Sequence, residues 1–254
     1  MKSKNRIGIF ADKSVGNKAL AFLLGKYFDD VQWVICNDEK SLTWSTLKDF
    51  NFNTNHVFIN SQLKDESILA KLRNSNVDYI LLAWWPYIIK EPILSIPNIG
   101  VLNFHPSMLP NNRGKHYNFW TIVENTPFGV SIHFVDETID GGDIIFQKKI
   151  DKDWLDTGET LYVKAQEAMI NLFTEKYSEI RKGNYIRKKQ NISLGSFHWG
   201  KELDSASKIL LDEKYKAREL INIIRARTFI PHPAAWFEED GKKYEIRIKI
   251  TKII

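Results

Sequence analysis

The amino-acid sequence predicts an α/β protein with a Rossmann-like, doubly wound and mostly parallel sheet, followed by a small C-terminal α+β appendage. The chain has 254 residues, 43% hydrophobic and 26% charged, which is enough for the core of one large domain. Four short segments in its N-terminal third are apolar almost throughout, the pattern of strands buried on both faces. Segments with apolar residues at helical spacing lie between them, so strands and helices alternate.

The expected elements follow a regular order up to about residue 104. Strands are expected at residues 7–11, 31–36, 57–60, 79–83 and 100–104. Helices are expected at residues 18–28, 44–50 and 65–73, each with its apolar residues on one side. Ligands of such sheets bind at the carboxyl ends of the strands, where the topology switches. The polar, proline-rich loop after residue 104 is therefore the expected position of a site.

The second half of the chain has a different pattern. Residues 118–124 begin a helix, and residues 129–135 and 143–150 alternate in polarity, which suits edge or antiparallel strands. A periodic run over residues 161–180 predicts a long helix that Thr157 or Thr160 could cap. The charged stretch after it divides the chain into a main domain, residues 1–190, and a smaller region, residues 191–254. In that region we expect a helix at 212–225, a turn at 239–241 and an alternating strand at 244–254.

Charge and cysteine content exclude several classes of protein. The net charge of +5 is mild: nucleic acid would explain it, but so would phosphate groups on a small substrate, and no run of five or more basic residues marks a nucleic-acid patch. The single cysteine, Cys36, rules out a disulfide within the chain, and no Cys/His spacing resembles a metal site. No segment has the ~18 consecutive apolar residues of a membrane helix. A cytoplasmic protein without a metal or membrane partner is expected.

The polar residues after the fifth predicted strand form a candidate catalytic pair. Residues 11–16, after the first strand, lack both the G-x-G-x-x-G and the phosphate-loop patterns, so a nicotinamide or ATP site has no support. Asn103 and His105 are two residues apart at a strand end and therefore share a face. An amide can stabilise an oxyanion while an imidazole moves a proton, and a nearby carboxylate would orient the imidazole. His133 lies in an alternating strand, where a structural role is favoured.

The combination of motifs is more specific than any single residue. The chain has N-x-H-P-S-x-L-P from residue 103, R-G from 113, G-V-x-x-H from 129 and D-x-G-D-I from 140. This set closely resembles the 10-formyltetrahydrofolate-dependent formyltransferase family, strongly over residues 80–164. That family includes glycinamide ribonucleotide formyltransferase, methionyl-tRNA formyltransferase and the sugar N-formyltransferases. The resemblance implies the formyltransferase fold, with residues 1–190 as its catalytic domain.

The resemblance also implies which residues carry the chemistry. Its catalytic trio falls on Asn103, His105 and Asp140, and Asp140 is preferred to Asp143 because it stands in the family's Asp-x-Gly step. N10-formyltetrahydrofolate would be the donor and tetrahydrofolate the product. The folate pocket of the family, built largely from backbone, maps onto two loops, whose residues are Trp85, Tyr87, Ile88, Ile89, Asp136, Glu137, Thr138 and Ile139.

The acceptor depends on the smaller C-terminal region. The presence of this region argues against the glycinamide enzyme, which resembles a single domain. The region also lacks the concentrated basic face expected of the methionyl-tRNA enzyme. Its aromatic segments resemble those of short sugar N-formyltransferases, which implies a dTDP-, UDP- or GDP-linked amino (dideoxy) sugar and a role in surface glycans such as lipopolysaccharide or O-antigen. The substrate-binding candidates are Arg113, Lys115, His116, Tyr117, Asn118, Lys201 and Arg225.

Three alternatives stay open from the sequence. They are a methionyl-tRNA formyltransferase-like enzyme, a non-catalytic folate- or nucleotide-binding regulator, and a 10-formyltetrahydrofolate hydrolase. An intact trio argues against the regulator. The hydrolase resembles a chain with an extra N-terminal domain, whereas the first strand here begins at Ile7. A homodimer is expected, because the alternating segment at 244–254 could pair with a second copy.

Overall fold

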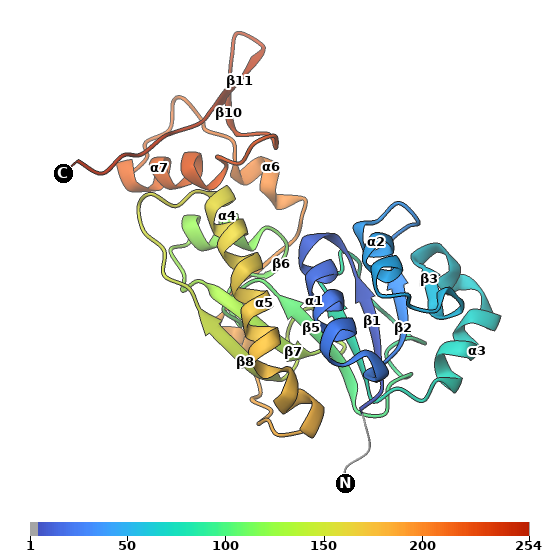
Figure 1. Ribbon diagram of the computed structural model, residues 1–254. Helices are drawn as coiled ribbons and strands as arrows, with labels where there is room; N and C mark the ends of the chain where they lie inside the picture. The colour runs from blue at the N-terminus through green and yellow to red at the C-terminus, as the bar shows by residue number, and fades with distance from the viewer. Residues whose placement is uncertain (1–4, 254) are drawn as a thin grey trace.

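Seven strands form one sheet in the computed structural model, which describes residues 5–253 (Figure 1). Their order is β3-β2-β1-β4-β5-β7-β8. The strands are β1 (Ile7–Ala11), β2 (Val31–Cys36), β3 (Val57–Ile59), β4 (Tyr79–Ala83), β5 (Gly100–His105), β7 (Gly129–Phe134) and β8 (Ile144–Lys149). The first five are parallel, while β7 and β8 run antiparallel to their neighbours. The prediction of a mostly parallel α/β sheet is confirmed.

Helices cover both faces of this sheet. The helices are α1 (Lys13–Lys26), α2 (Leu42–Asp49), α3 (Glu66–Asn74), α4 (Tyr117–Val123) and α5 (Gly158–Lys182). Apolar residues of α1, α2, α4 and α5 share one buried cluster with one face of the strands. Leu69 and Leu72 of α3 join a second cluster on the other face, around Phe10 and Trp33. The apolar residues of β1 to β4 are therefore divided between two cores, which explains why these strands are apolar throughout.

Helix α1 begins five residues earlier than predicted. Val15 is the one large apolar residue of the helix before Ala19, so the first turn, from Lys13, shows no apolar period, which is why the sequence pattern missed it. Gly16 permits this early start, because a Cβ there would lie 2.6 Å from the Ala83 carbonyl oxygen. The helix consequently packs directly against the ends of β1 and β4.

The long helix α5 is fixed at both ends. Thr157 caps its N-terminus, accepting a hydrogen bond from the Thr160 amide at 3.3 Å, and the Thr160 hydroxyl accepts one from the Thr157 amide at 2.9 Å. Near its C-terminus, Arg181 donates two hydrogen bonds to the Asp30 carboxylate, at 2.6 and 3.0 Å. The Tyr177 hydroxyl donates a third, at 2.9 Å. Asp30 lies just before β2, so these bonds join the C-terminal part of α5 to the start of that strand.

Replacing Arg181 by alanine is expected to lower the free energy of unfolding by about 3 kcal/mol, because the Asp30 side chain is only 1% exposed and would lose its cationic partner. Arg73→Ala is the matched control. The Arg73–Glu66 ion pair lies at the surface and should contribute no more than about 1 kcal/mol. Urea unfolding followed by circular dichroism measures both changes. Equal values for the two variants would contradict the structural role of the Asp30 cluster.

The C-terminal part is a small α+β unit that lies beyond α4 and ends in a projecting hairpin (Figure 1). It contains α6 (Glu202–Ala206), α7 (Ala217–Ala226), β10 (Ala235–Glu239) and β11 (Lys242–Ile246). Residues of α7 and the hairpin share a third hydrophobic cluster with Ile209. The expected α+β character is thus seen, while the boundary at residue 190 stays a prediction.

The predicted strand at residues 244–254 is wrong beyond Ile246. A tight turn with left-handed Asp240 and Gly241 sets the register of the hairpin, so Glu239 faces Lys242 and Ala235 faces Ile246. Strand β10, which the sequence pattern did not reveal, is only five residues long, and pairing stops where it ends. Ile248 packs on the third cluster instead, and Ile254 lies outside the described residues.

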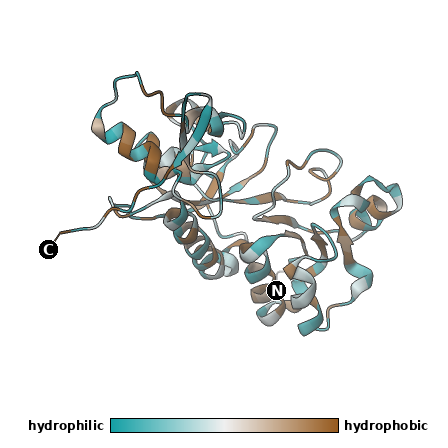
Figure 2. Cartoon of the chain, turned by 90° about the horizontal axis from the view of Figure 1, so that it is seen from above, coloured by the Kyte–Doolittle hydropathy of each residue, from teal (hydrophilic) through white to brown (hydrophobic). Residues whose placement is uncertain are grey.

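Polar and apolar residues are interspersed along the helices (Figure 2). Within residues 5–253, no helix is both long and apolar enough to cross a membrane.

Candidate active site

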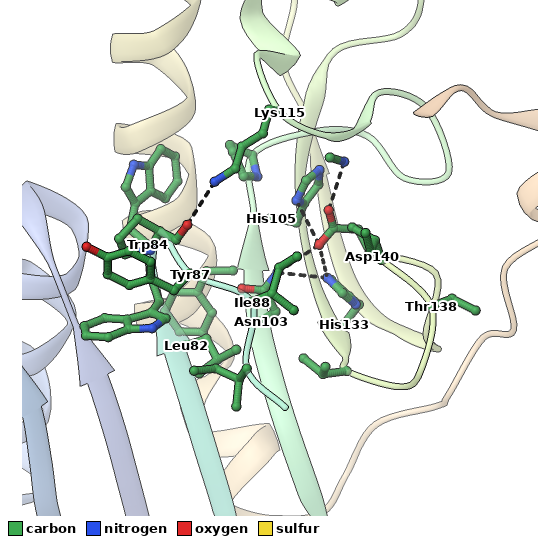
Figure 3. Close-up of a pocket in the computed structure, with 18 of the residues that line it drawn as sticks. Leu82, Trp84, Tyr87, Ile88, Asn103, His105, Lys115, His133, Thr138 and Asp140 are labelled. Atoms are coloured by element: carbon green, nitrogen blue, oxygen red, sulfur yellow. Dashed lines mark hydrogen bonds and ion pairs between the residues drawn. The ribbon is translucent and has the colours of Figure 1, made fainter. Parts of the chain in front are cut away.

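A cavity of about 670 Å³ opens at the carboxyl ends of β4 and β5 (Figure 3). Much of its lining comes from segments that are distant in the sequence: residues 84–91, 103–106, 114–117, 136–140 and 197–199. This is the edge at which ligands of such sheets bind: the strand order reverses between β1 and β4, and Lys13, just after β1, lines the cavity together with Leu82 of β4 and Asn103 of β5.

The three predicted catalytic residues meet at one side of this cavity. Strand β5 carries Asn103 and His105, and Asp140 lies in the loop between β7 and β8. Asn103 donates from Nδ2 to Asp140 Oδ1 at 3.2 Å, and His105 Nδ1 lies 3.4 Å from the same oxygen. The Gly114 amide donates to Asp140 Oδ2 at 2.9 Å. Both carboxylate oxygens of Asp140 are therefore oriented by neighbouring donors.

The loop that carries Asp140 is fixed by its own backbone conformation and by hydrogen bonds from Gln190. Asp140 has a left-handed backbone, with φ of 52°, a conformation that aspartate tolerates better than most residues. The Gln190 side chain donates to the carbonyls of Asp140 and Gly142, at 3.0 and 2.6 Å. These bonds hold the turn that aims the carboxylate at β5.

The electrostatics of the cluster favour an ionised carboxylate beside a neutral imidazole. Burial alone would raise the pKa of the Asp140 carboxyl, but the His105 and His133 rings and the Gly114 amide outweigh it and hold that pKa well below its usual range. Burial lowers the pKa of the His105 ring, more than the Asp140 carboxylate raises it. Because the Asn112 carbonyl can only accept, His105 Nε2 donates to it at 3.3 Å. A proton arriving at Nδ1 would then lie against the carboxylate.

His133 belongs to this cluster, although its sequence context favoured a role in structure alone. It is 1% exposed, its Nδ1 donates to the Phe134 carbonyl at 2.8 Å, and its Nε2 accepts from Asn103 Nδ2 at 3.2 Å. Strand pairing explains the position, because Asn103 and His133 are register partners in β5 and β7. The only signal in the sequence was the histidine of the G-V-x-x-H motif.

All eight residues predicted for the folate pocket line the cavity, on two facing loops (Figure 3). Tyr87 and Ile88 are 50% and 62% exposed, so they present apolar surface to the opening. The indole nitrogen of Trp85 is buried and has no hydrogen-bond partner among the described residues. Trp84, which the prediction did not include, also lines the cavity, with a left-handed φ of 61°. The pocket thus combines flat apolar walls with an unused buried donor.

Three of the seven predicted acceptor contacts, Lys115, His116 and Tyr117, line the cavity. The Lys115 ammonium reaches across it and donates to the Pro86 carbonyl at 2.9 Å (Figure 3). The C-terminal region, residues 191–254, is called the tail below. Two of its aromatic residues, Phe197 and Trp199, also line the cavity, with ring centroids 4.8 Å apart.

The other four predicted contacts lie outside the cavity wall. Arg225 is 6% exposed and its Nη1 donates to the carbonyls of Asp153 and Asp156, so it fastens α7 to the loop before α5. Asn118 donates to the Gly158 carbonyl at 2.8 Å. The Arg113 guanidinium lies over the Phe197 ring, and Lys201 is exposed. Asn118 and Arg225 thus bind neighbouring elements of the chain rather than the cavity.

Comparisons with known proteins agree with this geometry. A family model described as formyl transferase matches residues 23–176, and one described as an N-formyltransferase dimerization C-terminal domain matches residues 202–252. The methionyl-tRNA formyltransferase of Fusobacterium nucleatum is 28% identical over 214 residues, which are 82% of this chain and 67% of that protein. The chain thus matches about two thirds of the length of this curated relative.

Two solved structures are similar over most of the chain. A sugar N-formyltransferase from Shewanella sp. FDAARGOS_354 has a TM-score of 0.79 at 20% identity, covering 98% of this chain and 99% of that one. A formyltransferase from Anoxybacillus kamchatkensis, in complex with UDP-4,6-dideoxy-4-formamido-L-AltNAc and tetrahydrofolate, has a TM-score of 0.57 at 27% identity, covering 79% and 89%. Because the formyl transferase model matches more than half of the chain, the protein belongs to the formyl transferase family of enzymes.

Proposed function

We propose that the protein transfers the formyl group of N10-formyltetrahydrofolate to the amine of a nucleotide-linked amino sugar. The observation that carries the proposal is the cavity itself. Its lining brings Asn103, His105 and Asp140 together with the two loops predicted to bind folate, with Lys115, and with the aromatic residues Phe197 and Trp199 of the tail. A donor and an acceptor can therefore meet over the trio.

The donor side fits a folate. A pterin is flat and has a hydrogen-bonding edge, and the facing loops offer apolar walls, exposed backbone groups and the unpaired Trp85 indole nitrogen. When bound, N10-formyltetrahydrofolate supplies the formyl carbon that a neutral acceptor amine can attack. The tetrahydrofolate in the Anoxybacillus kamchatkensis complex supports this choice of donor.

The residues of the chain stabilise charge and move a proton. Asn103 stabilises the oxyanion that develops on the formyl oxygen; because its two Nδ2 hydrogens are directed at His133 and Asp140, this donation replaces one of those bonds. His105 accepts the proton that the amine loses, at Nδ1, where Asp140 stabilises it. His105 then returns the proton to the leaving nitrogen, so the trio ends in its starting state.

The acceptor side fits a sugar linked to a nucleotide. Phe197 and Trp199 offer rings against which a base or sugar can stack, and Lys115 can meet a diphosphate. The C-terminal family match and the UDP-sugar in the Anoxybacillus kamchatkensis complex support this choice. Methionyl-tRNA is the second candidate, favoured by the sequence match to the Fusobacterium nucleatum enzyme.

Three further properties belong to the same proposal. The protein acts in the cytoplasm, where folates and nucleotide sugars are available, and its product enters surface glycans. It forms a homodimer through the C-terminal region, in line with the family model for residues 202–252. The nucleotide is a dTDP, UDP or GDP carrier.

An acceptor screen tests the function. Purified protein is incubated with N10-formyltetrahydrofolate and a panel of nucleotide-linked amino sugars, and the products are weighed by mass spectrometry. We expect a gain of about 28 Da, a formyl group replacing one hydrogen, on at least one amino sugar, with methionyl-tRNA unchanged. Formylation of methionyl-tRNA and of no sugar would overturn the proposed acceptor.

A further inference from the structure

A short segment of the tail is paired with the loop whose backbone contacts His105 and Asp140. Strand β9 (Phe197–His198) runs parallel to β6 (Arg113–Gly114), with the Arg113 amide donating to Ser196 and the Lys115 amide to His198, both at 3.0 Å. A Cβ on Gly114 would lie 2.3 Å from the His198 carbonyl oxygen, so only glycine permits this approach. The Gly114 amide is also a donor to Asp140.

One carboxylate joins this tail segment to the loop. Glu124, at the C-terminal end of α4, accepts with Oε2 from Asn112 Nδ2 at 2.9 Å and from the Ser196 hydroxyl at 2.8 Å. Its Oε1 lies 2.7 Å from His198 Nε2. The His198 ring is stacked on Trp120, with centroids 3.6 Å apart, and its Nδ1 meets Glu202 at 3.1 Å. Glu124 is therefore the common partner of three groups from two distant segments.

The loop at residues 112–114, which Glu124 binds through Asn112, contacts the catalytic trio through two backbone groups. Asn112 is 1% exposed and left-handed, with φ of 52°, and its carbonyl faces His105 Nε2 at 3.3 Å. Two residues later, the Gly114 amide faces Asp140 at 2.9 Å. Asparagine tolerates this backbone conformation, and Glu124 and Thr126 bind the Asn112 side chain and so fix its orientation.

We propose that Glu124 is a positioning residue for formyl transfer, which keeps the tail segment 196–198 on the loop 112–114 and so sets the orientation of His105 and Asp140. Glu124 does not line the cavity and acts only through these neighbours. The inference rests on the proposed roles of His105 and Asp140.

Glu124→Ala and Glu124→Gln are the test variants. Alanine removes all three bonds, and we expect kcat to fall about 10- to 100-fold with KM for the folate unchanged, since small displacements of reacting groups carry such penalties. Glutamine keeps one oxygen for Asn112 and Ser196, so it should recover most of that loss. Glu175→Gln is the matched control, because Glu175 pairs only with Lys148 at the surface and should leave kcat unchanged.

A second measurement does not depend on turnover. The His105 ring faces Asp140, His133, Lys115 and the Asn112 carbonyl, and burial lowers its pKa. A loosened loop admits water, so the His105 pKa should move up toward its usual range in Glu124→Ala, as an NMR titration of the histidine rings can show. His105→Asn identifies the His105 signal.

The outcomes separate this inference from the proposed function. A lower melting temperature with unchanged kcat and unchanged His105 titration would assign Glu124 a role in stability alone and overturn the proposal. If the wild-type protein formylates no amino sugar, the proposed function fails, and the NMR titration still decides whether Glu124 positions His105.

Discussion

Replacing Asn103 by alanine is expected to lower kcat by about 100- to 1000-fold in a protein that remains folded, the usual effect of losing one oxyanion donor. Asn103 is the amide of β5 whose Nδ2 reaches both Asp140 and His133 at 3.2 Å. Truncation removes the donor that stabilises the charge on the formyl oxygen. Because that charge exists only in the transition state, kcat and kcat/KM should fall together while folate binding persists.

Asn111→Ala is the control for this variant. Asn111 lies in the following loop, donates one hydrogen bond to the Met108 carbonyl at 3.1 Å and is not part of the cavity wall. Its loss should change kcat by no more than a few-fold, a change attributable to loop packing. Single-turnover formyl transfer, with a folate-binding titration to count active sites, measures both variants. Near-normal turnover by Asn103→Ala would remove Asn103 from the mechanism.

Replacing His105 by alanine should lower kcat by about 100- to 10,000-fold, the range of general acid–base catalysis. The ring is 4% exposed and both nitrogens are engaged, with the Asn112 carbonyl and with Asp140. Among the described residues, no other side chain joins the Asp140 carboxylate to the Asn112 carbonyl. The exposed His56 provides the control, and His56→Ala should be unchanged in the same assay.

The burial of His105 also predicts how stability depends on pH. Its folded pKa lies below the usual value of 6.5, so between these two values the unfolded chain binds a proton that the folded protein does not. The free energy of unfolding should therefore fall as the pH drops below about 6.5, and less steeply in His105→Ala. Denaturant unfolding at several pH values from 7.5 downward checks this, and an identical slope in both proteins would contradict a buried neutral His105.

Much of the site could be predicted because it is local in the sequence. Asn103 and His105 are two residues apart in one strand, and the period of a strand places them on one face. The loop containing Asp140 follows the neighbouring strand directly. The apolar strands and the alternating helices likewise follow from spacing within short windows.

The failures of prediction share a physical cause, which is that the partner lies far away along the chain. Arg225 is on an amphipathic helix, but nothing in its own sequence says that the buried face meets the carbonyls of Asp153 and Asp156. The strand at 244–254 was overextended because its length depends on β10. In both places tertiary contacts took precedence over the local pattern.

The α/β fold, the order of its strands along the chain and the candidate trio could all be predicted from residue patterns, because each depends on spacing within one element or on a motif. Three further features became visible in the folded chain alone: His133 adjoins Asn103, Arg225 fastens a loop, and Glu124 joins the tail to the loop at residues 112–114. These depend on strand register and on contacts between residues up to 74 positions apart in the chain, which no local pattern encodes.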